Sequence, residues 1–496
     1  MLIPNRVRRR ALALPIAAVL AALPSTAAAA PPVPQTRTAL AFGDNLLVRQ
    51  AVFMSTHNSY SGDLGGMHRG TIEQQLNNWV RFLEFDVYNN EYAKHHDFRI
   101  GHWGPDSEVY KEGTNPRTAL LTPWLNQVRS WSDNNPGHAP ITVMLDLKSN
   151  ISAVVNSADG NLSTLNQKVT AAFEDKLVWA EGRETEPGRV GELRNKIMVV
   201  LSGNQTSRVS YLRDTGVGPA VSVNTKGQVV QVHADRDNNL WYWTGQVRAA
   251  DKKIEWRAHG RYDKGRNPAV ALRPDGLLIE VHRSQNFANL YYHVGEILPS
   301  GQISWGPSTR YQSSAEDPTI RLDPPRANAF LEIDTPVGGT QRYARVMTLD
   351  PAKRTVTLGG QSPTSERISK TTSIVAGQPE VRVYTRGDDR FPADTLRYTL
   401  RNPDGSGRIT YRQVMYAEQQ ASDSVADTSQ QYFFGAPVGD TTALRSAHAA
   451  QKATRGWQFR SPANDAIPWY VNFPATDYPD ERELRAYLYR TRAWVH

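Results

Sequence analysis

The chain has 496 residues, with 57 Lys or Arg against 49 Asp or Glu and a formal net charge of +8. It contains no cysteine, which excludes disulfides and thiolate metal sites. The length allows a buried core without covalent cross-links, and it predicts more than one domain.

The first 30 residues have the pattern of a secretory signal peptide. Arginines between Arg6 and Arg10 precede an apolar run over 11–24, and small residues follow at 27–30. The apolar run is short for a membrane span, so we expect cleavage and export of a soluble, secreted protein. Cleavage would lower the formal charge from +8 to +4, because the segment has four arginines and no acids. This mild basic bias favours anionic lipid surfaces and is too diffuse to indicate nucleic acid.

Apolar runs alternate with helical patterns from about residue 40 to 216, which predicts a first set of about five β/α units. Polar side chains follow these runs where a buried strand would end, as in STHNSY (55–60), RFLEFDVY (81–88), IGHW (100–103) and PITVMLDLK (140–148). A (β/α)8 TIM-type barrel presents its active site in this way. The expected strands are 51–54, 83–87, 141–147 and 196–203, and the expected helices are 71–80 and 160–177.

The polar residues of these runs fit phosphodiester cleavage. His57 and His102 can move protons near neutral pH, one taking and one giving. Oxygen ligands without thiolate suit a hard cation such as calcium, which lowers the cost of negative charge on phosphorus. The expected calcium ligands are Asn58, Glu84, Asp86 and Asp146. The acids of 81–88 stand in a near-continuous apolar strand, where they need a partner or a metal.

Two further motifs have open interpretations. Lys148 lies two residues beyond Asp146 and is either a phosphate contact or a solvated lysine at a strand end. His68, Arg69 and Gly70 spell HRG, which resembles the opening motif of glycerophosphodiester phosphodiesterases. That motif closes the first strand of its family, whereas here it follows a glycine-rich loop. We therefore expect His68 and Arg69 to be rim or loop residues.

The ordered set HN, ExD, GH and a strand ending in an acid resembles the X region of phosphatidylinositol-specific phospholipase C, especially the calcium-dependent secreted bacterial branch. The resemblance assigns calcium to Asn58, Glu84, Asp86 and Asp146, and catalysis to His57 and His102. It implies attack of the inositol 2-hydroxyl on phosphorus, which gives a cyclic phosphate and releases diacylglycerol. His102 would protonate the leaving oxygen. His57 would stabilise the charged phosphoryl group or act as the base. If it is not the base, a calcium-bound carboxylate, Glu84 or Asp146, would be.

Repeats begin near residue 219. VVQVHADRDNNLWYW at Val229 recurs as LIEVHRSQNFANLYYHVG at Leu278, with an offset of roughly 49 to 50 residues, and fainter copies start at Arg342 and Leu396. Four units of short strands predict an all-β repeat domain, plausibly propeller-like. We favour blade core for its repeated aromatics and a structural role for His233 and His282, with glycan binding by the aromatics as the alternative.

The barrel pattern returns after about residue 422, with expected strands at 431–437, 455–459 and 469–473 and expected helices at 441–454 and 480–495. The segments GWQF and NFPATD also resemble the tail of the same phospholipase family. The predicted division is a signal peptide (1–30), the first barrel part (40–216), an inserted β-repeat domain (217–421) and the last barrel part (422–496). The insert would then separate the fifth strand from the sixth.

The sequence therefore predicts a secreted, calcium-dependent phosphodiesterase that acts on an inositol phospholipid at a membrane surface, with a monomer favoured. One alternative is a secreted glycan- or surface-binding protein with an inactive barrel. Others are phosphodiesterases for glycosylphosphatidylinositol anchors, glycerophosphodiesters or sphingolipids. Formation of a cyclic phosphate separates the inositol lipids from glycerophosphodiesters that water hydrolyses directly.

Overall fold

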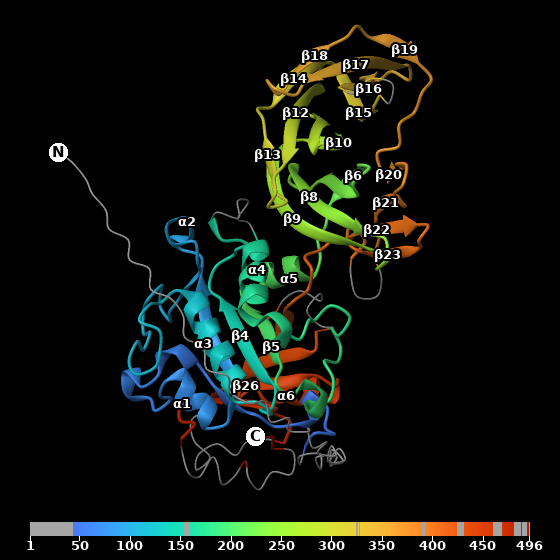
Figure 1. Cartoon of the computed structure of the whole chain (residues 1–496). Coiled ribbons are helices and arrows are strands. Elements are labelled where there is room, and N and C mark those ends of the chain that lie inside the picture. The colour runs from blue at the N-terminus through green and yellow to red at the C-terminus, as the bar shows by residue number, and fades with distance from the viewer. Residues whose placement is uncertain are drawn as a thin grey trace, which may run out of the picture. The chain divides into compact units, whose positions relative to one another are not determined.

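The computed structural model of the chain describes residues 43–152, 159–323, 326, 328–387, 392–423, 431–459, 469–480, 488, 494 and 495. The expected signal peptide and most of the expected helix over 480–495 lie outside these residues. A closed parallel barrel and four small antiparallel sheets organise the described chain (Figure 1).

Eight parallel strands of the described residues form the barrel. Their order is β1-β2-β4-β5-β24-β25-β26-β27, and β27 pairs with β1 to close the sheet. The short β3 (Arg99–Ile100) pairs antiparallel with β2 outside the ring. The barrel strands are β1 (Met54–Thr56), β2 (Val80–Tyr88), β4 (Ile141–Leu147), β5 (Ile197–Gly203), β24 (Tyr416–Gln420), β25 (Phe433–Pro437), β26 (Ala453–Phe459) and β27 (Phe473–Thr476). The expected closed parallel barrel is confirmed.

Four described helices each connect two successive barrel strands: α1 (Ile72–Asn77), α3 (Leu121–Asn134), α4 (Leu162–Phe173) and α6 (Thr441–Ala449). The short α2 (Tyr92–His95) precedes β3, and α5 (Gln205–Leu212) follows β5. Helix α4 begins where Asn161 accepts a hydrogen bond from the Thr164 backbone N–H, and it buries Leu165 and Val169. Among the described residues the helices are fewer than a full eightfold alternation of strand and helix requires.

The chain between β5 and β24 forms four antiparallel sheets arranged like a propeller, one for each expected repeat unit. The first has β6 (Val217–Val223), β7 (Gln228–Ala234), β8 (Asn239–Arg248) and β9 (Lys253–Lys264). The second has β10 (Arg266–Leu272), β11 (Leu277–Arg283), β12 (Asn289–Ile297), β13 (Ile303–Trp305) and β14 (Thr309–Ser313). The third has β15 (Ala315–Leu322), β16 (Ala329–Pro336), β17 (Arg342–Asp350), β18 (Thr355–Leu358) and β19 (Ser362–Thr364). The fourth has β20 (Thr372–Ser373), β21 (Glu380–Thr385), β22 (Leu396–Arg401) and β23 (Gly405–Arg408).

The expected position of the insert, between the fifth and sixth barrel strands, is wrong. Among the described residues, only four strands of the barrel ring precede the insert: β1, β2, β4 and β5. Strand β24 pairs in parallel with β5 on one side and with β25 on the other. Strand β24 is therefore the fifth strand, and the barrel resumes before residue 422. Its sequence YAEQQ puts Glu418 and Gln420 where an apolar run would mark a buried strand, so the periodicity of the sequence conceals it.

The aromatic positions of the repeats are buried or half-buried. Trp243 and Trp256 are buried, and the rings of Tyr262 and Trp305 stack with centroids 4.4 Å apart. This placement fits blade packing. Within the described ranges, no helix has the length and apolar character needed to cross a membrane.

Candidate functional site

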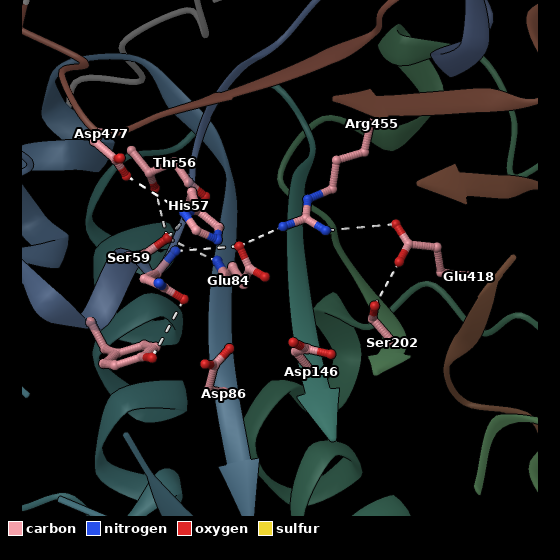
Figure 2. Close-up of polar contacts among 12 residues, drawn as sticks. Thr56, His57, Ser59, Glu84, Asp86, Asp146, Ser202, Glu418, Arg455 and Asp477 are labelled. Atoms are coloured by element: carbon pink, nitrogen blue, oxygen red, sulfur yellow. Dashed lines mark hydrogen bonds and ion pairs between the residues drawn. The ribbon is translucent and has the colours of Figure 1, made fainter. Parts of the chain in front are cut away.

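Three neighbouring barrel strands bring the polar residues to one edge. His57 and Asn58 follow β1, Glu84 and Asp86 lie in β2, and Asp146 lies in β4. Because β1, β2 and β4 are parallel neighbours, their carboxyl ends meet at the same end of the barrel. Figure 2 shows His57 and the three carboxylates gathered over these strands.

Glu84, Asp86 and Asp146 form a carboxylate cluster in which one oxygen of each residue lies within 4.8 Å of the others. The register of β2 and β4 pairs Asp86 with Asp146. Glu84 precedes Asp86 by two residues, so both side chains leave the same face of the strand. Glu84 and Asp86 are buried. Buried carboxylates need compensating positive charge, which the cluster must receive from side chains or from a metal.

Lys148 supplies one positive charge to the carboxylate cluster. Its Nζ lies 2.9 Å from Asp86 Oδ2 and 2.7 Å from Asp146 Oδ2. Burial acts to lower the pKa of Lys148, but the two carboxylates raise it above its ordinary value and keep the amine charged. Lys148 follows the end of β4 and is exposed to solvent, but its amine contacts both carboxylates of the cluster.

Arg455 in β26 supplies a second positive charge, which the sequence did not reveal. Its Nη2 lies 2.5 Å from Glu84 Oε2, and its Nη1 lies 3.9 Å from Oε1 of Glu418 in β24 (Figure 2). Burial acts to raise the pKa of Glu84, but Arg455 holds it below its ordinary value. The Glu418 carboxylate also accepts a hydrogen bond from Ser202 Oγ at 2.6 Å. Arg455 in β26 therefore bridges Glu84 of β2 and Glu418 of β24 in the barrel interior.

The carboxylate cluster retains free ligand atoms and excess negative charge. Asp86 Oδ1 and Asp146 Oδ1 are buried without a hydrogen-bond partner. Burial, together with the nearby charges of Asp86 and Glu84, raises the pKa of Asp146 to about 6 although Lys148 acts to lower it. Glu84, Asp86 and Asp146, with Glu418, share the positive charges of Lys148, Arg455 and a protonated His102, so the group is negative when all four acids are ionised. Two unpartnered carboxylate oxygens in a negative site fit a hard divalent cation such as calcium.

Asn58 links the first strand to the second. It has a left-handed backbone conformation with φ 46° and ψ 55°, which asparagine tolerates better than most residues. Its backbone N–H donates to Glu84 Oε2 at 3.3 Å, and its Nδ2 lies 3.3 Å from His102 Nδ1. Its Oδ1 accepts a hydrogen bond from the Tyr60 hydroxyl at 3.4 Å. The strained backbone directs the Asn58 side chain between the carboxylate cluster and His102.

His102 lies just beyond β3, and its ring is held by a carboxylate. Its Nδ1 lies 3.3 Å from Asp86 Oδ2, and this hydrogen bond raises the pKa of His102 although burial acts to lower it. The Tyr88 hydroxyl donates to the His102 carbonyl at 2.9 Å and fixes the backbone. A raised pKa favours the protonated ring, which can act as a general acid from Nε2.

His57 is held by a second carboxylate, Asp477, which follows β27. His57 Nδ1 lies 3.6 Å from Asp477 Oδ1, and Arg69 forms an ion pair with the same oxygen. Burial acts to raise the pKa of Asp477, but His57 and Arg69 lower it below its ordinary value. The carboxylate is therefore ionised and can orient the His57 ring, which leaves Nε2 to face a substrate.

Arg69 lies in a loop, as expected, but its side chain is only 4% exposed and points into the site. It reaches Asp477 from the glycine-rich loop and also donates to the Gly62 carbonyl at 3.4 Å. His68 is exposed, and its ring lies 5.9 Å from that of Tyr478. Arg69 thus positions Asp477, while His68 stays at the surface.

The structure gathers the expected residues at this edge of the barrel, and it adds Arg455, Glu418, Asp477 and Arg69. Asp477 lies in the segment NFPATD, which the sequence linked to the phospholipase tail, so a signal for it was present. Arg455 begins the expected strand over 455–459 but carried no sign of its partner. Its role follows from β26 lying across the barrel from β2.

No protein-family model and no curated protein matches the chain. Among solved structures, a calcium-dependent phosphoinositol-specific phospholipase C from Pseudomonas sp. is similar at 23% identity and TM-score 0.28, over 34% of this chain and 62% of that one. A calcium-dependent phosphatidylinositol-specific phospholipase C from Streptomyces antibioticus matches at 17% identity and TM-score 0.27, over 32% and 55%. An α-L-arabinofuranosidase from Fusarium graminearum matches at 10% identity and TM-score 0.24, over 40% and 68%. The chain spans less than two thirds of both phospholipases, and matches this partial do not assign it to a family.

Proposed function

We propose that the protein is a secreted, calcium-dependent phosphodiesterase that cleaves phosphatidylinositol-type lipids into diacylglycerol and a cyclic inositol phosphate. One observation carries the proposal: two histidines, each held at Nδ1 by its own carboxylate, flank a cluster of acids with unpartnered oxygens. A general base, a general acid and a site for positive charge are the parts that displacement at phosphorus needs.

His57 is the favoured general base. Asp477 faces its Nδ1, so Nε2 is available to take the proton of the inositol 2-hydroxyl. Glu84 is a weaker candidate because Arg455 occupies its Oε2 and lowers its pKa. The 2-hydroxyl oxygen then bonds to phosphorus while the bond from phosphorus to the glycerol oxygen breaks.

His102 is the general acid for the leaving group. Its Nδ1 faces Asp86, so a proton on Nε2 passes to the departing glycerol oxygen as diacylglycerol leaves. Lys148 and Arg455 limit the negative charge of the carboxylate cluster, which favours approach of an anionic phosphodiester.

Asn58, Glu84, Asp86 and Asp146 would hold calcium, and the unpartnered oxygens of Asp86 and Asp146 support this assignment most directly. Calcium bound there would supply positive charge to the phosphoryl oxygens as negative charge develops. The partner at the membrane would be an inositol phospholipid. The Trp103 side chain next to His102 is 79% exposed, and tryptophan favours the interface between water and lipid.

Phosphorus NMR of the purified chain with phosphatidylinositol, with calcium and with excess chelator, tests the proposal. A cyclic inositol phosphate signal that disappears with chelator is the expected result. His102→Ala should lose turnover and keep calcium binding, whereas the control His95→Ala, at a partly exposed histidine of α2, should remain active. Turnover without calcium would overturn the metal assignment. Absence of turnover in both conditions would favour a binding protein or another phosphodiester.

A further inference from the structure

Residues of the first and second sheets of the inserted domain form a cluster of ligand-type side chains that is separate from the barrel site. Asp263 lies near the end of β9, His282 near the end of β11 and His293 within β12. One ligand atom of each residue lies within 4.8 Å of the others. Both histidines are buried, whereas the Asp263 side chain is 30% exposed. An ion from solvent can therefore reach the cluster past Asp263.

Hydrogen bonds fix the orientation of both imidazole rings. His282 Nδ1 lies 3.0 Å from Glu280 Oε2, and His293 Nδ1 lies 2.9 Å from the Gly306 carbonyl oxygen. The Glu280 carboxylate also accepts a hydrogen bond from the Tyr262 hydroxyl at 2.9 Å, so it acts as an acceptor to both neighbours. A nitrogen that faces an acceptor must carry a hydrogen. Nδ1 of each ring therefore carries a hydrogen. His293 Nε2 also faces an acceptor, Asp263 Oδ2, so it carries a hydrogen when no metal is bound and would present its lone pair to a metal.

Both Nε2 atoms face the same carboxylate oxygen. Asp263 Oδ2 lies 2.9 Å from His293 Nε2 and 3.5 Å from His282 Nε2. Without a hydrogen or a metal among them, two lone pairs and a carboxylate oxygen repel one another. Asp263 and Glu280 carry two negative charges, and the ion pairs found for them in the described chain involve only these two histidines. Two protons or one divalent cation would balance the cluster.

A divalent cation balances it at lower electrostatic cost. Two protons would create two imidazolium rings whose centroids are 5.6 Å apart and nearly parallel inside the sheet, and like charges at that distance repel. A metal instead uses both Nε2 lone pairs and the carboxylate. Zinc bonds of about 2.0 Å imply tetrahedral ligand separations of about 3.3 Å, which lies between the two nitrogen–oxygen distances above.

The neighbouring repeats show that the charge balance is particular to the second sheet. Gln231 stands 49 residues before Glu280, so the corresponding cluster of the first sheet has one acid, Asp214, with His233 and His259. The His259 ring stacks 4.3 Å from Trp243, and a single acid there faces two histidines.

In the third sheet, an arginine balances the charge of two buried acids. Glu332 and Asp334 occupy the inner-strand positions there, and Arg345 lies 3.2 Å from the first and 3.5 Å from the second. Within the described repeats, buried Glu280 and half-buried Asp263 thus form ion pairs with histidines alone.

We propose that Asp263, His282 and His293 bind a divalent transition metal, with Zn²⁺ the best match to two imidazole nitrogens and one carboxylate oxygen. Glu280 and the Gly306 carbonyl orient the two rings by accepting hydrogen bonds from their Nδ1 atoms. The metal joins β9, β11 and β12, so it cross-links the first two sheets of a domain that has no cysteine to do so.

Titration of the chelator-treated full chain with Zn²⁺, against a chromophoric chelator, tests the site, and Co²⁺ absorption reports nitrogen ligands. Asp263→Asn, which preserves shape, and His293→Gln should weaken Zn²⁺ binding by at least 100-fold. Glu280→Gln should weaken it by about 10- to 100-fold, as loss of a residue that orients a ligand does. Thermal unfolding with added chelator shows whether each variant is folded.

Two control variants separate this cluster from the others. Asp146→Asn alters the barrel cluster and His233→Gln alters the first sheet, so both should retain the Zn²⁺ affinity and the Co²⁺ spectrum of the parent protein. Absence of Zn²⁺ binding at micromolar concentration, or binding that survives in Asp263→Asn and His293→Gln, would overturn the proposal. Loss of binding in His233→Gln alone would place the metal in the first sheet and also overturn it.

Discussion

Replacement of Arg455 by methionine should destabilise the barrel strongly. Arg455 and Glu84 are each 4% exposed and lie 2.5 Å apart, and Glu418 faces the other side of the guanidinium. Methionine keeps much of the volume but leaves two carboxylates buried without their cation. Removal of one partner from a buried ion pair costs about 3–5 kcal/mol.

The expected cost converts into a measurable shift of the unfolding midpoint. A domain of the size of the barrel loses about 2–4 °C per kcal/mol, so Arg455→Met should unfold about 6–20 °C below the parent protein. The control Arg117→Met removes an ion pair with Glu112 whose side chains are 65% and 72% exposed. Such surface pairs contribute less than about 1 kcal/mol, so the control should shift the midpoint by only a few degrees.

Scanning calorimetry of both variants and of Arg455→Met/Glu84→Gln measures these shifts. The double variant should recover part of the loss, because it removes a buried carboxylate together with its cation. Calcium should stabilise Arg455→Met more than the parent protein, since the carboxylate cluster then lacks one positive charge. Equal midpoints for Arg455→Met and Arg117→Met would refute the assignment of Arg455 as a buried counter-ion.

Further predictions concern the proposed phosphodiesterase site. Asp477→Asn should lower kcat by about 10²- to 10⁴-fold with little change in KM, measured by steady-state release of inositol phosphate, because His57 loses the group that orients it; an unchanged kcat would exclude His57 as the base. The hydrogen bond to Asp86 raises the pKa of His102, so the proton needed by the leaving group is present at low pH and is lost as pH rises through that pKa. Asp86→Gln should move the alkaline limb of kcat/KM to lower pH, provided activity remains measurable, and an unmoved limb would count against His102 as the acid. The pKa of Asp146 is raised to about 6. The group therefore stabilises the fold fully at pH values below the ordinary carboxyl pKa near 4, and this stabilisation is lost as pH rises to about 6. Asp146→Asn should therefore unfold at a higher temperature than the parent without calcium at pH 7–8, show no such gain near pH 4, and bind calcium more weakly by calorimetric titration; a lower midpoint at pH 7–8 would contradict a destabilising carboxylate.

The residues of the first barrel strands were predictable because local sequence defines them. An apolar run such as that around Glu84 and Asp86 indicates a strand buried on both faces, and parallel strands of a barrel bring their ends together. The repeat offset of about 49 residues likewise predicted the separate β sheets. Helix α4 lies within the range 160–177 that its periodicity predicted, and the structure adds the cap by Asn161.

The fifth strand and the ion pairs across the barrel were not predictable in this way. Strand β24 has polar residues because its side chains meet Ser202 and Arg455 in the barrel interior, and no local pattern marks such a strand. Arg69 lies 408 residues from Asp477 in the chain, so its burial depends on a contact that sequence spacing does not encode.

The sequence by itself determined which residue types stand at the ends of the barrel strands and how often the β units recur, because both depend on short-range periodicity. The tertiary structure decided how charge is balanced. Because β27 closes the sheet beside β1, Asp477 lies next to His57 Nδ1. The position of β26 brings Arg455 into contact with Glu84. Electrostatic energy depends on distance through space and on burial, and both are fixed only when strands far apart in the chain come together.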